Sequence, residues 1–245
     1  MNSTLVPPPA TTTHALFADL DAHGLNLQAV FALESLPAEV LHTLALSDAE
    51  RARFRQLILV GHRGRRFWTA LQERGMHGAH PVDQFVTECI AAWMNGPLHG
   101  HAWRQVFPGP QAVGLQNLGR LAGWHHASPF WVGVHQDWGS WFAYRAVVLA
   151  DTDLALTPRL ESPSPCDSCS DKPCIRACPA GALASTASGA WQLQTCLDFR
   201  KRAQSPCQDR CLARNACPVG AAHRYDDAQI RYHYLHSMQA IRQYC

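Results

Sequence analysis

Cysteines gather in the last third of the chain at spacings that suit metal chemistry. The stretch CDSCSDKPCIRACP, residues 166–179, holds four cysteines within thirteen residues, and the fourth is followed by proline. Further along, Cys196 precedes a second group, which also ends in a cysteine followed by proline. The cysteines of the two groups, with Cys196 between them, are Cys166, Cys169, Cys174, Cys178, Cys196, Cys207, Cys211 and Cys217. Such thiols can form disulfides, bind zinc or hold iron–sulfur clusters.

The two groups repeat one another, because CPAGA at 178–182 is echoed by CPVGA at 217–221. This repeat resembles the two-cluster ferredoxin fold, in which the cysteine before the proline binds the cluster of the other group. The resemblance implies two crossed sets of ligands for two [4Fe–4S] clusters. The first set is Cys166, Cys169, Cys174 and Cys217, and the second set is Cys178, Cys196, Cys207 and Cys211.

The spacing departs from the usual C-x2-C-x2-C-x3-C-P, because four residues separate Cys169 from Cys174. We interpret the difference as wider loops. Zinc is the alternative, but its four-cysteine sites usually combine C-x2-C pairs, and the region has one such pair, Cys166 and Cys169. We also expect the proline of each Cys-Pro pair, Pro179 and Pro218, to start a short helix.

The distribution of cysteines predicts two domains. Residues 1–165 hold one cysteine and residues 166–245 hold nine, and the stretch before Cys166 has the proline and serine content of a linker. We expect an α+β domain over 1–155 and a small ferredoxin-like domain over 160–245. The first-domain cysteine, Cys89, lies on the apolar stripe of an expected helix and is interpreted as a core residue.

Hydrophobic periodicity and turn residues predict the elements. Expected helices cover 14–23, 37–44, 62–75, 81–94, 111–122 and 226–241. Expected strands cover 25–33, 56–61, 130–135 and 140–150, the last two joined by a turn at 136–139.

Composition narrows the function classes. The chain is 47% hydrophobic, which is typical of a globular protein, and its N-terminus lacks the basic and apolar regions of a signal peptide. We therefore expect a cytoplasmic protein with no membrane span. The net charge of +2 would fall to about −2 with two clusters bound, which argues against a broad nucleic-acid surface. The basic run 200–202 is interpreted as a solvated face.

The stretch VGVHQDWGSWFAYRAVVL, residues 132–149, resembles the HPxxGxWFAxRxVVL pattern of the cobalamin-processing cobalamin C family, and HPVDQFV at 80–86 resembles another segment of it. The motif HxxWGSWF followed by the cysteine repeat is also similar to epoxyqueuosine reductases and reductive dehalogenases. The resemblance implies a nitroreductase-like first domain that binds cobalamin and receives electrons from two clusters. The sequence has no match to the acidic DYH context of epoxyqueuosine reductase.

Residue types suggest where a cofactor would lie. Planar aromatic surface beside a glycine suits a macrocycle, although core tryptophans and a hydrogen-bonded histidine would explain the same residues. The candidate cobalamin contacts are His135, Trp138, Gly139, Ser140, Trp141 and Phe142. His125 and His126 are candidate proton donors, with a plain surface role as the alternative.

These observations predict an iron–sulfur oxidoreductase that relays electrons through two [4Fe–4S] clusters to cobalamin. Its electron donor would be a small redox protein such as a ferredoxin or flavodoxin. Two alternatives stay open: a ferredoxin-type electron-transfer module for a partner protein, and a variant of epoxyqueuosine reductase, which would act on tRNA.

Overall fold

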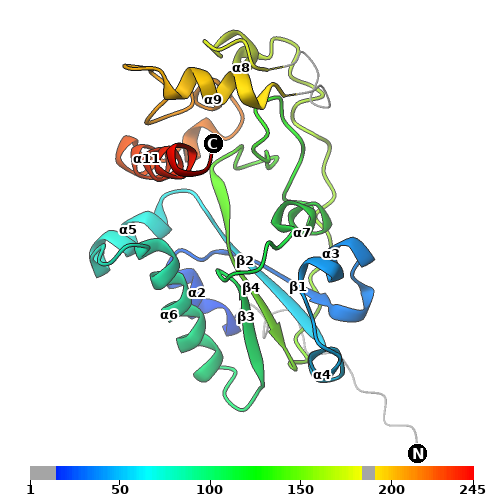
Figure 1. The fold of residues 1–245 in the computed structure, drawn as a ribbon. Helices are drawn as coiled ribbons and strands as arrows, with labels where there is room; N and C mark the ends of the chain where they lie inside the picture. Colours follow the sequence, from blue (N-terminus) through cyan, green and yellow to red (C-terminus); the bar gives the residue numbers. More distant parts are fainter. Residues whose placement is uncertain (1–14, 184–190) are drawn as a thin grey trace, which may run out of the picture. The chain divides into compact units, whose positions relative to one another are not determined.

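The computed structural model describes residues 15–183 and 191–245, and the chain divides into two compact units (Figure 1). Unit 1 comprises residues up to Ala122 together with Ala143–Arg159. Unit 2 comprises Gly123–Phe142 and Leu160–Cys245. Unit 1 thus ends close to the boundary expected near residue 160. Residues 123–142, which we expected in the first domain, group with the cysteine-rich unit.

Unit 1 is built on a four-stranded sheet with the order β1-β2-β4-β3. Strand β1 (Leu27–Ala32) pairs antiparallel with β2 (Gln56–Arg63), and β3 (Trp103–Phe107) pairs antiparallel with β4 (Phe142–Ala150). Every residue of β2 from Gln56 to His62 is buried, because helices and loops cover the strand. A small antiparallel sheet with helices packed on it confirms the predicted α+β class.

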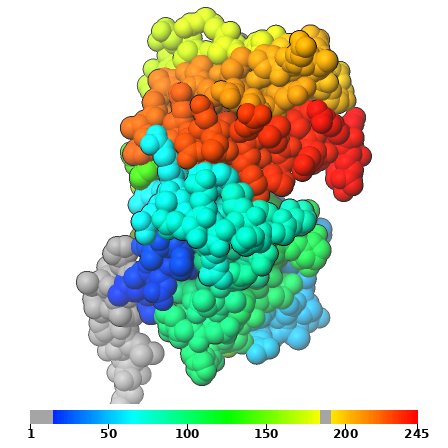
Figure 2. Space-filling view, turned by 90° about the vertical axis from the view of Figure 1, so that its left-hand side faces the viewer, coloured from blue at the N-terminus to red at the C-terminus, as the bar shows by residue number. Residues whose placement is uncertain are grey.

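The helices of unit 1 are short apart from two. They are α2 (Ala18–Ala22), the 3-10 helix η1 (Leu33–Ser35), α3 (Ala38–Thr43), α4 (Asp48–Arg53), α5 (Arg66–Arg74), α6 (Pro81–Asn95) and α7 (Leu115–Leu121). In Figure 1, α2, α5 and α6 gather on one side of the strands, and α6 contacts both of the others. Figure 2 shows the side chains of α2, α5 and α6 forming one continuous face of this unit.

The structure of α6 confirms the helix that hydrophobic periodicity predicts over 81–94. Its apolar stripe is buried, and Cys89 within the stripe is only 8% exposed. Trp93 on the same face stacks on Phe17, with ring centroids 5.2 Å apart, and donates a hydrogen bond from Nε1 to the Leu16 carbonyl. The prediction that Cys89 is a core residue is therefore confirmed.

Unit 2 has little regular structure outside its last helix. Its helices are α8 (Pro173–Arg176), α9 (Leu193–Lys201), α10 (Leu212–Asn215), the 3-10 helix η2 (Ala221–His223) and α11 (Asp227–Tyr244). Helices α8 and α10 contact each other, and each ends just before a Cys-Pro pair. The expectation that Pro179 and Pro218 start helices is wrong. Pro173 takes the helix-starting position instead, where its missing N–H costs nothing.

Other differences from the sequence prediction concern weakly patterned segments. Residues 130–135 do not form a strand, and only isolated bridges join His126 to Val134 and His135 to Gly139. The second bridge closes the expected turn at 136–139. Helix α4, strand β3 and the helices α8, α9 and α10 were not anticipated. None of the helices between residues 15 and 183 or between 191 and 245 has the length and apolar character needed to cross a membrane.

Candidate functional site

All ten cysteines lie in the described part of the chain, and all are free thiols. No disulfide joins any of them in this structure. The eight cysteines of the repeat lie in unit 2, where they are buried or half-buried.

The thiols of the first set influence one another. Burial raises the pKa of Cys166 to about 11, and the neighbouring thiols Cys217, Cys174 and Cys169 add to the rise. Burial also raises the pKa of Cys174, and Cys217 and Cys169 contribute again. The pKa of Cys217 is raised by burial, with a contribution from Cys169. The thiols that influence Cys166, Cys174 and Cys217 therefore all belong to the first set.

The second set behaves in the same way. Burial raises the pKa of Cys196 to about 11, and its neighbours Cys211, Cys178 and Cys207 add to the rise. The pKa of Cys207 is raised by burial and then by Cys211 and Cys178. For every cysteine whose pKa shifts in this repeat, the neighbouring thiols belong to its own set.

A cavity of about 340 Å³ within unit 2 is lined by all four cysteines of the second set. Aromatic and apolar side chains, among them Phe130 and Leu212, line the rest of it together with Arg200 and Arg214. Among the described residues, no three His, Cys, Asp or Glu side chains are arranged around a single metal ion. The four thiols of the second set instead surround a space larger than one ion.

Segment 123–142 packs against the cysteines. Phe130 and Val134 form an apolar cluster with Cys174, Cys217 and Ala213. Cys178 and Cys211 pack against the same cluster. Both cysteine sets therefore contribute to one apolar core, and the segment that resembles the cobalamin C pattern helps to build it.

The turn at 135–142, which holds the candidate cobalamin contacts, lies largely in the interior of unit 2. His135 is buried, and its Nδ1 accepts a hydrogen bond of 3.1 Å from the backbone N–H of Asp137. Ser140, Trp141 and Phe142 are buried as well. Trp138 lies against the ring of His223, with centroids 4.0 Å apart. These side chains have partners inside the unit.

Gly139 shows why the turn needs glycine. Its φ is +57°, and a Cβ at this position would overlap the carbonyl oxygen of Val219. Val219 lies two residues after Cys217, so the close approach is to the cysteine loop and not to an open surface. Gly220 makes the reciprocal approach to the backbone of Trp138. The structure thus places Gly139 against the backbone of the loop that follows Cys217, and its contact with cobalamin stays a prediction.

The two candidate proton donors also contribute to the packing of segment 123–142. His125 is buried, and its ring fills the space that a side chain at Gly133 would need. The Nε2 of His126 lies 3.0 Å from the hydroxyl oxygen of Ser162. The backbone of His126 exchanges hydrogen bonds with Val134.

Arginines beside the second set were missed by sequence reasoning. The backbone N–H of Arg214 donates to Cys211 Sγ at 3.5 Å, and its buried side chain donates to the hydroxyl and carbonyl oxygens of Ser140. The guanidinium also lies over the rings of Trp141 and Tyr225, at 4.6 and 5.4 Å from their centroids. It forms no ion pair with a carboxylate in the described residues.

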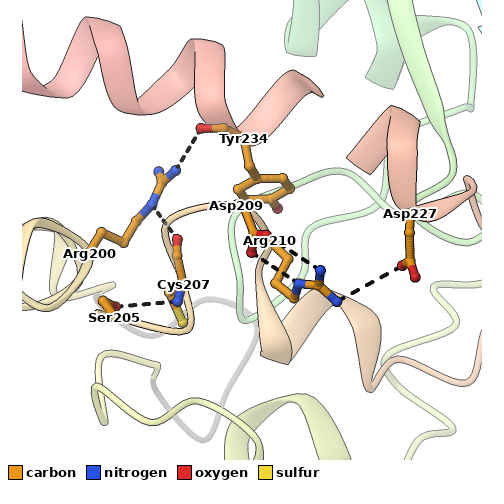
Figure 3. A network of polar contacts seen from close by, with 7 residues as sticks. All are labelled: Arg200, Ser205, Cys207, Asp209, Arg210, Asp227 and Tyr234. Atoms are coloured by element: carbon orange, nitrogen blue, oxygen red, sulfur yellow. Dashed lines mark hydrogen bonds and ion pairs between the residues drawn. The ribbon is translucent and has the colours of Figure 1, made fainter. Parts of the chain in front are cut away.

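Arg200 is the second such residue (Figure 3). Its Nε donates to the carbonyl oxygen of Cys207 at 3.1 Å, and its Nη2 donates to the carbonyl oxygen of Tyr234 at 3.4 Å. Burial raises the pKa of Tyr234 to about 12, and the positive charges of Arg214 and Arg200 oppose that rise. The signal in the sequence was the four-residue spacing of Cys196 and Arg200, which places both on one face of α9. Arg200 is half-buried and not part of a solvated face.

The sequence matches no known protein family and no curated protein. The fold, however, is similar to several solved structures. Epoxyqueuosine reductase from Bacillus subtilis aligns with a TM-score of 0.56 at 10% identity, over 89% of this chain and 67% of that one. An epoxyqueuosine reductase solved with a tRNA-Tyr epoxyqueuosine-modified stem loop aligns with a TM-score of 0.55 at 10% identity, over 90% and 68%.

The B12-trafficking protein CblC of C. elegans aligns over 95% of both chains, with a TM-score of 0.51 and 12% identity. The chain spans about two thirds of the length of the epoxyqueuosine reductases that it matches. At these identities the likeness establishes a shared fold, which links both groups suggested by the sequence motifs.

Proposed function

We propose that this protein is an iron–sulfur oxidoreductase that holds two [4Fe–4S] clusters, one on each cysteine set. The observation that carries the proposal is the grouping of the thiols. All four thiols of the second set line one cavity, and the thiols that influence Cys166, Cys174 and Cys217 all belong to the first set. When bound, the clusters would supply one-electron transfer at potentials set by the surrounding protein.

The residues around the thiols fit such a group. With raised pKa values, Cys166 and Cys196 are protonated at neutral pH in the metal-free protein, so cluster binding would release protons from them. The cavity beside the second set offers space next to all four of its sulfurs. Phe130 and Val134 belong to an apolar cluster that includes or contacts two thiols of each set.

We further propose that the electrons go to a cobalamin and come from a small redox protein such as a ferredoxin or flavodoxin. Support for cobalamin is the fold shared with the B12-trafficking protein over almost the whole of both chains. The residues of the turn do not fit a corrin contact, because His135, Ser140, Trp141 and Phe142 are buried and Gly139 abuts Val219. No residue of this chain is therefore assigned to cobalamin.

A second candidate function is favoured by the similarity to epoxyqueuosine reductases, one of which was solved with a tRNA stem loop. In that case the substrate would be epoxyqueuosine in tRNA. A plain electron-transfer module for a partner protein would need only the clusters of unit 2.

Metal analysis tests the cluster proposal first. Protein purified without oxygen should be brown and carry about eight irons per chain, since each cluster has four. The variant Cys245→Ser is the matched control, because Cys245 is exposed and outside both sets. It should keep the full iron content. Stoichiometric zinc with little iron in the wild-type protein would contradict the proposal.

Measurements of cobalamin binding and of tRNA conversion distinguish the cobalamin-linked reductase, the epoxyqueuosine reductase variant and the electron-transfer module. The iron-loaded protein should bind cob(II)alamin, seen as a change in the absorbance spectrum and as heat in calorimetry. Absence of binding at high micromolar cobalamin would favour the electron-transfer module. Conversion of an epoxyqueuosine-containing tRNA stem loop to queuosine, dependent on added cobalamin, would favour the reductase variant.

A further inference from the structure

Arg200 is held against two cysteines of the second set. It lies on α9 four residues after Cys196, so the two side chains share a face of that helix. Its Nε donates to the carbonyl oxygen of Cys207, which belongs to the same set. Arg200 also lines the cavity that the four cysteines of the second set surround.

Contacts with α11 fix the position of the guanidinium. Nη1 donates to the hydroxyl oxygen of Ser237 at 3.2 Å, and Nη2 donates to the Tyr234 carbonyl. The group lies 5.4 Å from the centroid of the Tyr234 ring. Three uncharged oxygens and an aromatic ring thus hold a planar cation that cannot lose its proton at any physiological pH.

The charge of Arg200 is not neutralised by a carboxylate. Within residues 15–183 and 191–245, no ion pair involves it. Arg210, which lines the same cavity, differs in this respect, because Asp209 lies at 3.0 Å and Asp227 at 4.0 Å (Figure 3). Arg200 is therefore a net positive charge beside the second set, whereas Arg210 is compensated.

We propose that Arg200 is a positioning and tuning residue that raises the reduction potential of the cluster on the second set. This inference rests on the proposed function. A cluster that takes up one electron from a reductant gains one negative charge, and no bond to carbon, nitrogen or hydrogen changes. A fixed cation in a partly buried, low-dielectric site stabilises the reduced form more than the oxidised form. The reduction potential rises as a result.

Potentiometric titration with dithionite, followed by EPR under anaerobic conditions, tests the inference. In Arg200→Gln, one of the two centres should shift to a more negative potential, and the other should keep its wild-type potential. The shifted centre should be the one that Cys207→Ser removes. In Arg200→Lys, which keeps the charge but loses the fork of donors, most of the wild-type potential should remain.

Arg202→Gln is the matched control. Arg202 lies just after α9, is exposed, and has its guanidinium over the Phe199 ring at 5.0 Å. Both potentials should stay at their wild-type values in this variant. An equal shift in Arg202→Gln would mean that net charge acts at a distance, and it would overturn the role assigned to Arg200.

A second variant covers the case in which Arg200→Gln loses the cluster. Ser237→Asp introduces a carboxylate beside Nη1 and neutralises Arg200 without removing its hydrogen bonds to Cys207 and Tyr234. The potential of the same centre should fall. Full iron content with unchanged potentials in Arg200→Gln, or in Ser237→Asp if the first variant loses iron, overturns the inference. Wild-type protein without iron overturns the proposed function instead.

Discussion

The two units of this protein reach their folded states by different means. In unit 1, the sheet and α6 bury a continuous set of large apolar side chains, including Leu57, Ile58, Leu59, Ile90 and Trp93. In unit 2, buried apolar residues fall into small separate clusters, and cysteines are members of the one that contains Phe130. The difference teaches that hydrophobic periodicity can specify one part of a chain, whereas the other part has only small apolar clusters, one of which includes cysteines.

Removing the iron should produce the largest difference between the two units, measured as the protection of their amides from hydrogen exchange. A chelator under oxidising conditions should leave the amides of β2 and α6 protected from hydrogen exchange, while those of α8, α9 and α10 exchange quickly. The reason is that unit 1 has its own apolar core, whereas binding energy at metal sites acts as folding energy where the core is small. Exchange is measured by mass spectrometry. Equal protection of both units after iron loss would break the comparison.

Replacing single cysteines of unit 2 by serine should show which cysteines hold the same cluster. Cys217→Ser should remove the same EPR signal as Cys166→Ser, and Cys207→Ser should remove the same signal as Cys178→Ser. Each should lower the iron content from about eight to about four per chain, since one cluster of four irons is lost. If Cys217→Ser and Cys211→Ser abolish the same signal, the crossed sets are wrong.

A glycine pair sharpens the comparison inside unit 2. Gly139→Ala should lower the free energy of unfolding by about 2–5 kcal/mol, combining the left-handed backbone with a clash against the Val219 carbonyl. Gly181→Ala is the control, because φ is +62° there and no atom of the described residues lies within 4 Å of an added Cβ. It should cost only about 1–2 kcal/mol. Urea titration of the iron-loaded proteins gives both values, and equal losses would show that the Val219 contact is unimportant.

The smallest expected effect concerns Cys89 in unit 1. Burial raises its pKa to about 11 from 9.0. Between these pH values the unfolded state has released the proton and the folded state has not, so the free energy of unfolding falls as pH rises. Below pH 9 there is no contribution. The wild-type protein should lose stability relative to Cys89→Val between pH 9 and 11 in urea titrations, and a constant difference between the two proteins would contradict the shift.

Sequence reasoning located the elements with strong periodicity. Strands β1 and β2 and helices α5 and α6 all lie within or next to the predicted ranges, because each buries a full face. Helix α4 was missed although Ser47 and Glu50 form a capping box, since none of its residues is buried. Strand β3 was missed because its exposure does not alternate and its register shifts after Gln105.

The site was harder to predict where contacts between residues far apart in the sequence determine the position of a side chain. The repeat predicts which cysteines form each set, and that grouping stays a prediction; the thiols that raise the pKa of Cys166 and Cys196 belong to their own sets. The apolar run at 130–135 has the composition of a strand, but Phe130 and Val134 bury themselves among the cysteines instead. Local propensity cannot foresee such a partner, because the partner lies about 40 or more residues away along the chain. The close approach of Gly139 to the Val219 carbonyl was missed for the same reason.

The chain passes between the units three times, after Ala122, Phe142 and Arg159. Segment 123–142 is therefore synthesised before the residues that bury Phe130, Val134 and Trp141, which include Cys217, Ala213 and Tyr225. A nascent chain that has reached residue 160 carries these side chains without their partners. Chaperones would find a binding segment there during translation, and a gene truncated at the linker would encode an aggregation-prone fragment instead of an isolated first domain.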